Sequence, residues 1–577
     1  MTTRLTISGF FKAARLAHGK SLTRAKSPAF VASLTGRGIT GAIASLLGLM
    51  VLVAPLSSLA RSAKPAPDPV APLVANLPLS LEDCRRLALA HNLVLRAQRE
   101  TLAAAGFLRK AELGAFEPEF AATGTEEFNQ RKNTVEQTIS QGTAVFEEKN
   151  KLYSAGLEGL TPTGARYNFG YSVRDLNNNL RVLPTDPLLR QFQSFLGVTL
   201  TQPLLKDAGF SSSMAHIRLA REDENVARQE FRRQMLVVVG SVESVYWDLY
   251  VAQERLELRR ASVAAAERLL VENRERVQEG KMAEIELVEA EAGLAQRRSA
   301  ASDAMQHLVE VSGRLRTLFA EPVDEPNWVL HASDVPPAAA PAAPIDEALR
   351  DSVALHPEYL SRLHRAEQEK VRVAYARNQR WPQVDLKASY GNNGLGDSYH
   401  SSITDLEHDD HESWSVGVEL RIPVLTGIRQ ANTVRAAQAH RREALLNLKA
   451  AEVEIANNIF TAQRKVESLK AVAANYDEVA AAGQRLLKNE QNRLTEGKTD
   501  SRRLLEVENQ FADAQVASIE SRGEYEKARV EFEMSSGRLL KLRGLDLEDT
   551  AANKKTKAKT DTVAVNAPAT ASKTDAR

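Results

Sequence analysis

The chain repeats a short motif inside two similar stretches, and an internal repeat constrains a fold before any single motif does. Glu279-Gly280-Lys281 recurs 217 residues later as Glu496-Gly497-Lys498, each time within a run of helix-forming residues. Glycine costs about 1 kcal/mol relative to alanine inside a helix. Its presence twice in the same setting therefore calls for a structural reason.

Three further landmarks occur in the same order in both halves: a helix opening, a helix end at a proline, and a strand that runs through proline into a helix. They are LPLSLEDCRRLALAHN and APIDEALRDSVALHP, then Phe116-Glu117-Pro118 and Arg380-Trp381-Pro382, then VTLTQPLL and VELRIPVL, which contain Pro203 and Pro423. A Pro/Ala-rich connector, residues 321–344, lies between the halves. We therefore predict two structural repeats, over residues 79–320 and 345–543.

Each half contains one long helical pattern. Steps of four and three residues from Phe231 to Val277 meet apolar side chains almost throughout, as in the a/d seam of a coiled coil. The same seam recurs from Leu448 to Leu494. The pattern predicts long helices that pack along a continuous stripe.

The repeated glycines fit the ends of these helices. A helix over residues 210–278 is roughly 100 Å long, and extending it to residue 319 would give a rod of roughly 160 Å. Glycine is common just after a helix because it adopts positive φ readily. We therefore predict two antiparallel helical hairpins with tips at Gly280 and Gly497. Their returning helices are expected over 281–319 and 498–540, and shorter helices over 80–115 and 345–380.

Segments between the helices alternate polar and apolar residues. Examples are residues 166–173, 384–390 and 414–422, and residues 119–128 and 195–202 are also strand-like. Such segments with aromatic residues at their ends are typical of transmembrane β-barrels. Two strands per half cannot close a barrel, so the pattern predicts a barrel shared by several chains. The segment between the last two strands is expected to be a polar, acidic loop.

The N-terminus has the pattern of an export signal. Residues 1–38 carry Arg and Lys but no Asp or Glu, and an apolar run over residues 39–60 ends at Ser58-Leu59-Ala60. We expect a signal peptide over residues 1–60, with a permanent transmembrane helix as the alternative. A Pro-rich linker over residues 61–78 and a disordered tail over residues 544–577 are expected from composition.

The composition disfavours several classes of function. Lys and Arg total 75 against 74 Asp and Glu, so nothing drives binding to nucleic acid. The single cysteine, Cys84, excludes a disulfide framework. We found no phosphate-binding loop or nucleophile motif, and His408 and His411 lie in the acidic loop. The chain is therefore expected to be no enzyme and to have no cofactor and no metal site.

These landmarks, in this order and twice, resemble the TolC family of outer-membrane efflux proteins over residues 79–543. The resemblance implies a mixed α and β membrane protein that forms a homotrimer. Its strands contribute to one transmembrane β-barrel, surrounded by outer membrane lipid, and its hairpins form a periplasmic α-barrel. A periplasmic adaptor (membrane fusion protein) and an inner-membrane pump would complete a tripartite efflux or type I secretion system. It further implies four strands per chain, whereas residues 152–173 read as a surplus hairpin.

The resemblance also suggests functional residues. Those at the adaptor-facing tips are Glu279, Gly280, Lys281, Glu496, Gly497 and Lys498. Glu506, nine residues after Gly497, matches a carboxylate that rings the closed end of the tunnel in the family. The family's basic residue two positions after the glycine is Thr499 here, so Arg502 or Arg503 pairing with Glu286 is the alternative lock. Pro203 and Pro423 mark the strand-to-helix junctions.

Two other functions explain part of the sequence. An exported coiled-coil scaffold explains the heptads but neither the export signal nor the alternating strands. A passive porin explains the strands but not a chain that is mostly helical.

Overall fold

The computed structural model describes residues 78–179, 191–320, 329–337, 344–408, 411–422, 427–496, 498–499 and 501–545. All of them belong to one compact unit, Pro72–Arg577. The signal peptide, most of the Pro-rich linker, nearly all of the tail, Pro423 and Gly497 lie outside the described residues.

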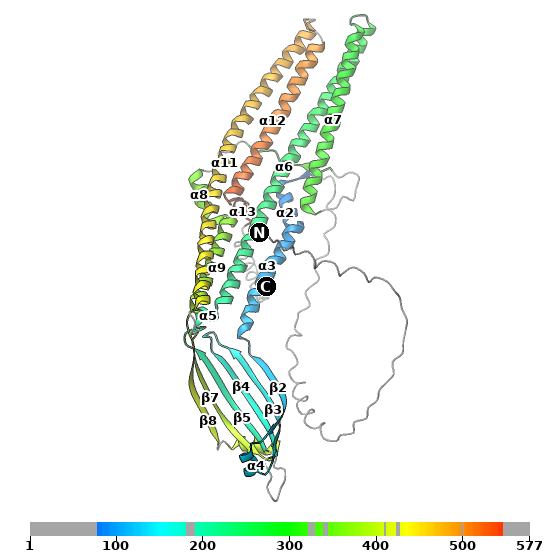
Figure 1. Cartoon of the computed structure of the whole chain (residues 1–577). Helices are drawn as coiled ribbons and strands as arrows, with labels where there is room; N and C mark the ends of the chain where they lie inside the picture. The colour runs from blue at the N-terminus through cyan, green and yellow to red at the C-terminus, as the bar shows by residue number, and fades with distance from the viewer. Residues whose placement is uncertain are drawn as a thin grey trace, which may run out of the picture. The chain divides into compact units, whose positions relative to one another are not determined.

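Long helices, one large sheet and one small two-stranded sheet make up the described part of this unit (Figure 1). The large sheet has six strands in the order β2-β3-β4-β5-β7-β8, and every neighbouring pair in it is antiparallel. The strands are β2 (Glu119–Lys132), β3 (Val145–Leu160), β4 (Arg166–Asn178), β5 (Gln191–Pro203), β7 (Gln383–Gly396) and β8 (Glu412–Arg421). The surplus hairpin predicted over residues 152–173 is present as β3 and β4, with Leu160 opposite Arg166.

Helices lead into and out of four of these strands. Helix α3 (Leu93–Ala111) precedes β2, α6 (Ala215–Gln278) follows β5, α9 (Pro357–Asn378) precedes β7, and α11 (Ile428–Thr495) follows β8. Helix α6 packs against α3 and α9, and α9 packs against α11. The helices are thus arranged side by side in the order of the strands that they continue.

The two shorter helices predicted over residues 80–115 and 345–380 are each broken in two, contrary to expectation. Helix α2 (Leu81–His91) ends at Asn92, and α8 (Ile345–Leu355) ends at His356. Asn92 caps α3 by accepting a hydrogen bond from Leu95 N at 3.0 Å. Pro357 occupies the first turn of α9, where its missing N–H costs nothing.

The two long hairpins form as predicted, with slightly different ends. Helix α6 pairs with α7 (Glu284–Phe319), and α11 pairs with α12 (Ser501–Ser535), which is followed by the short α13 (Leu539–Leu542). A short helix α5 (Phe210–Ser213) precedes α6. Figure 1 shows both hairpins extending away from the sheet.

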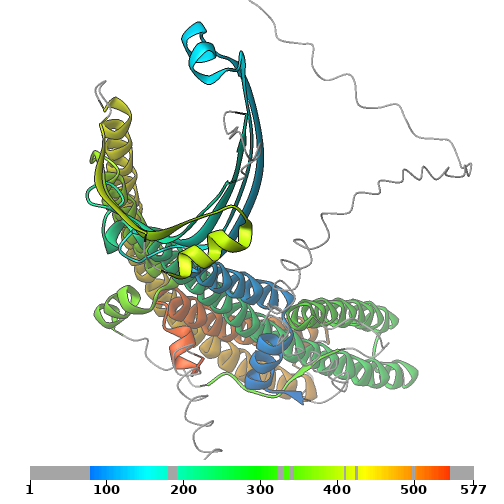
Figure 2. The same ribbon diagram turned by 90° about the horizontal axis from the view of Figure 1, so that it is seen from below.

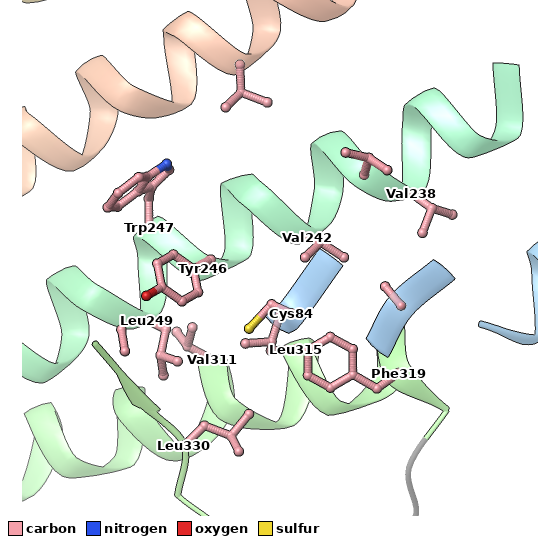
Figure 3. Packing of buried hydrophobic residues seen from close by; sticks show 14 of the residues in the cluster. Cys84, Val238, Val242, Tyr246, Trp247, Leu249, Val311, Leu315, Phe319 and Leu330 are labelled. Carbon is pink, nitrogen blue, oxygen red and sulfur yellow. The ribbon is translucent and has the colours of Figure 1, made fainter. Parts of the chain in front are cut away.

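The main apolar core lies where α2, α6 and α7 meet (Figure 3). Val242, Tyr246 and Leu249 of α6 are fully buried, as are Val311 and Leu315 of α7. Val242 and Leu249 belong to the predicted seam. Helix α6 is also long and apolar enough to cross a membrane by length and composition, but most of that apolar stretch is buried in this core.

The second core is smaller and centres on α11. It includes Ile455, Ile459, Ala462 and Val466, which lie on the second predicted seam, and Phe532 of α12. A single stripe of α11 is therefore covered within the chain.

The connector and the end of the N-terminal linker pair with each other, which the sequence did not indicate. Strand β1 (Pro78–Leu79) runs parallel to β6 (His331–Ala332). The Tyr246 hydroxyl donates to Leu79 O and accepts from Asp334 N, both at 3.0 Å. This contact holds the start of the first repeat against α6.

The polar segment between β7 and β8 is not only a loop, as was expected. It contains α10 (Tyr399–Glu407), whose first turn is closed by a capping box at Ser398. The ring of Tyr399 meets Phe192 of β5 edge-on at 6.5 Å between centroids. In Figure 2 the sheet is bent into an arc, and α10 lies on its convex side.

Candidate functional site

One face of the sheet is apolar on all six strands. The register places one residue from each strand in a continuous row, which we call the aromatic row: Phe120, Leu157, Phe169, Val198, Tyr390 and Trp414. Their exposed fractions range from 43% to 72%, so no other part of the described chain covers them. Phe192, which contacts α10, lies on the same face of β5 as Val198, which makes this the convex face.

The opposite face is polar. The next row along the strands, which we call the polar row, contains Glu119, Glu158, Asn168, Thr199, Ser389 and Ser415. The hydroxyls of Ser389 and Ser415 lie 2.9 Å apart in a hydrogen bond. An apolar convex face and a polar concave face are typical of the strands of a transmembrane β-barrel.

A third row on the polar face lacks side chains at its centre. This glycine row consists of Ala121, Gly156, Gly170, Gly197, Gly391 and Ser413. A Cβ on Gly156 would lie 2.8 Å from Gly170 Cα, and one on Gly391 would lie 2.7 Å from Gly197 Cα. The strands therefore bend here in a way that only glycine permits.

The junction from sheet to helix is built on Pro203. This residue ends β5 and is buried, and Leu204 N donates to Val384 O at 2.8 Å just beyond it. Proline suits the end of a strand because it cannot donate to a further partner. The corresponding Pro423 lies outside the described residues.

The first hairpin tip is a Schellman turn. Gly280 has φ of 70°, its N–H donates to Val277 O at 2.9 Å, and Lys281 N donates to Arg276 O at 2.8 Å. Lys281 and Glu279 form an exposed ion pair at 2.7 Å. These three residues therefore lie at the tip, as their sequence pattern predicted.

The second tip has matching contacts. Lys498 N donates to Arg493 O at 2.9 Å, and Lys498 pairs with Glu496 at 2.6 Å. Thr499 donates its hydroxyl to Glu490, a buried carboxylate on α11, at 2.6 Å. The position that the family fills with a basic residue is thus used here to secure the tip itself.

The proposed gate residues lie in the first turns after the tips. Arg502, Arg503 and Glu506 are exposed on α12, and Glu286 is half-buried in the first turn of α7. Arg503 pairs with Glu506 of its own helix at 2.8 Å. The pairing of an arginine with Glu286 stays a prediction.

Ion pairs join the two hairpins along α12, and no sequence pattern indicates them. Lys527 pairs with Asp248 at 2.8 Å, Arg259 pairs with Asp513 at 3.0 Å, and the buried Arg297 of α7 pairs with Glu508 at 3.2 Å. Burial raises the pKa of Glu508, although Arg297 opposes that shift. These contacts fix the first hairpin against the second.

A buried ionic cluster lies between the start and the end of the described chain. The side chain of Glu243 on α6 is only 1% exposed and pairs with Arg85 of α2 at 3.2 Å and with Arg543 at 2.8 Å. Hydrogen bonding to Glu243 raises the pKa of Arg543, and burial raises the pKa of the neighbouring Glu533. Periodicity could not reveal this cluster, because Glu243 lies 158 residues from Arg85 and 300 residues from Arg543.

Comparisons with known proteins agree with this arrangement. A model of the family described as outer membrane efflux protein matches residues 176–321 and 350–538, more than half of the chain. Comparison with curated proteins finds no match.

Solved structures share the fold at low sequence identity. A membrane protein from Pseudomonas aeruginosa is 16% identical, with a TM-score of 0.55 over 82% of this chain and 99% of that one. The CmeC outer membrane channel of Campylobacter jejuni is 15% identical, with a TM-score of 0.56 over 79% of this chain and 85% of that one. The MtrE outer membrane channel of Neisseria gonorrhoeae is 15% identical, with a TM-score of 0.54 over 79% of this chain and 88% of that one.

Proposed function

The chain belongs to the family of outer membrane efflux proteins, and from this premise we propose that three copies of it form one channel-tunnel. The strands of the copies close a β-barrel in the outer membrane, and the helices form a periplasmic tunnel. Substrates pass through it unchanged from an adaptor and an inner-membrane pump to the exterior. The family consists of channel proteins, not enzymes.

The observation that carries this proposal is the alternation of rows across the sheet. The aromatic row exposes large apolar side chains on the convex face, whereas the adjacent polar row lies on the concave face. A coiled-coil scaffold in water would gain nothing from such an exposed apolar face, since large exposed patches usually mark a membrane or a partner. The long hairpins, in turn, disfavour a passive porin.

The two edges of the sheet support assembly from several copies. Within the part of the chain that the structure describes, β2 and β8 each have a partner on one side only. An unpaired edge in lipid would leave N–H and C=O groups without hydrogen bonds, so it must pair with another copy. On α11, Leu446, Val453 and Phe460 are spaced by seven residues and are 50% to 71% exposed, as a seam for a neighbouring copy would be.

We also propose that residues 79–320 and 345–543 are copies of one ancestral unit. The family model matches one stretch in each half. The breaks at Asn92 and His356 and the two tips with their matching ion pairs support the same boundaries.

The hairpin tips are the surface that we assign to the periplasmic adaptor. Glu279, Lys281, Glu496 and Lys498 are each more than half exposed there. Ile285 and Val288, which follow the first tip, are also 64% and 57% exposed. A small apolar surface with paired charges at its end is suited to a protein partner.

We predict that Gly280→Pro abolishes export while assembled channels stay in the outer membrane. Proline fixes φ near −65° and has no N–H, whereas Gly280 has φ of 70° and donates to Val277. The change therefore distorts the tip far from the sheet. Export of a pump substrate and heat-modifiable trimers in outer-membrane fractions are the two measurements. Gly293→Ala, a change with open space around it on α7, is the control. Normal export by Gly280→Pro would contradict the role of the tip.

We propose that Glu506 contributes to the gate. Three symmetry-related copies would place like charges around the channel axis and favour cations. Because Arg503 lies 2.8 Å from Glu506, it offsets part of that charge.

Two substitutions should therefore shift the selectivity in opposite directions. Glu506→Gln is expected to lower the cation selectivity of purified channels in planar bilayers, and Arg503→Gln to raise it. Reversal potentials in a salt gradient measure both. Equal selectivity in the two variants would remove this pair from the gate.

A further inference from the structure

We propose that the hairpin β3–β4 widens the exit barrel, so that the outer-membrane pore is about as wide as the helical tunnel that feeds it. The inference rests on the proposed trimer. It gives six strands per chain and eighteen in the barrel, instead of the four and twelve that the family resemblance implies.

The hairpin is a full part of the sheet. Strand β3 pairs with β2 along all fourteen residues from Glu119 to Lys132, and β4 pairs with β5 from Arg166 to Leu176. Its turn is anchored as well, because Gly209 N donates to Thr163 O at 3.0 Å and the Ser213 hydroxyl donates to Pro162 O. Nearly all of the hairpin precedes residue 176, where the family match begins.

The hairpin adds strands without adding helices. Helices α3 and α6 pack against each other, although β2 and β5, which they continue, are separated by β3 and β4. Four adjacent helices span about 32–40 Å at 8–10 Å between axes. Six strands span about 38 Å at a spacing of about 4.8 Å and a tilt of about 40°, whereas four strands span about 25 Å. Six strands therefore match the width of the helical layer, and four do not.

The directions of the strands allow a barrel to close with six strands from each chain. The strands alternate in direction from β2 to β8, so the two edge strands run in opposite directions. An antiparallel pair can then form between β8 of one copy and β2 of the next. The aromatic row extends to both edges, at Phe120 and Trp414, and would continue around the barrel.

The concave face carries few large side chains along the glycine row. Gly156 and Gly170 have no side chain, whereas the ring of Phe195 lies beside Gly197 and Gly391. The neighbouring polar row has two carboxylates, Glu119 and Glu158, and four neutral polar residues.

Distances between symmetry-related spin labels test the width directly. At a tilt of about 40°, eighteen strands give a backbone radius of about 18 Å and a label separation of about 31 Å across a trimer, against about 21 Å for twelve strands. Thr199→Cys places a label on the concave face of β5. The native Cys84 is fully buried, which raises the pKa of its thiol to about 12, so labelled wild-type protein is the control. A separation near 21 Å would overturn the proposal.

Deletion of residues 145–178 provides a second readout in the same labelled background. It lets β2 pair with β5 while the aromatic row stays aligned, from Phe120 to Val198. We expect the separation to shorten from about 31 Å to about 21 Å, and an unchanged separation would also overturn the proposal. If the deletion prevents assembly, the full-length distance decides alone. Absence of trimers from the outer membrane in the full-length protein would instead refute the proposed function.

Discussion

Replacing Glu243 by alanine is expected to lower the free energy of unfolding by about 3 kcal/mol, the lower end of the range for breaking a buried ion pair. Two arginines lose their common partner, although Arg543 keeps Glu533 and Arg85 keeps Glu82. Arg85 and Arg543 both bond to Glu243, whose side chain is 1% exposed. Denaturant unfolding of the detergent-solubilised protein, followed by circular dichroism, measures the change.

A matched substitution separates burial from loss of charge. Glu467 of α11 pairs with Arg464 at 3.0 Å, but its side chain is 50% exposed. Exposed pairs of this kind contribute about 0–1 kcal/mol, so Glu467→Ala should leave the midpoint nearly unchanged. If the two variants lost similar free energies of unfolding, burial would not strengthen the Glu243 ion pairs.

The structure explains why so large an effect could come from one residue. Glu243 lies on α6, Arg85 on α2 before the first strand, and Arg543 beyond the last long helix. The cluster therefore ties together three segments that are far apart in the sequence. Contacts between such distant segments leave no local pattern in the sequence, since hydrophobic periodicity reports only on residues within a few turns of one another.

Local features of the fold were predictable because their signals lie within a few neighbouring residues. The tip at Gly280 follows from a periodic run that ends at a residue able to adopt positive φ, and β7 and β8 follow from strict alternation. The break before α9 also has a local signal, because Pro357 directly follows His356 and proline favours the first helical turn. The break at Asn92 was harder to see, since its side chain also bonds to Leu318 O, 226 residues away.

The order of strands in the sheet could not be predicted from the individual strand segments. Residues 152–173 were recognisable as a hairpin, but alternation cannot say which strands are neighbours. The neighbour relations come from the register, which aligns the aromatic row across five strand pairs. That alignment gives the sheet its two faces and therefore supports the barrel.

Because the convex face is assigned to lipid, a charge placed on it should have a large effect on stability. Val198→Arg is expected to destabilise the membrane-inserted protein by about 2–4 kcal/mol per chain, the cost of an arginine on the lipid face near the bilayer midplane. Val198 lies in the aromatic row and is 43% exposed on the convex face. Each trimer would carry the substitution three times, so the amount of heat-modifiable trimer in outer-membrane fractions should fall sharply.

The neighbouring residue supplies the control within the same strand. Thr199 occupies the polar row on the concave face, so Thr199→Arg would place its charge in the water-filled lumen and should leave trimer levels close to those of the wild type. Strand propensity and sequence position are nearly the same for the two sites, and only the face differs. If both variants assembled equally well, the convex face would not contact lipid. If Thr199→Arg were the damaging change, the assignment of inside and outside would be reversed.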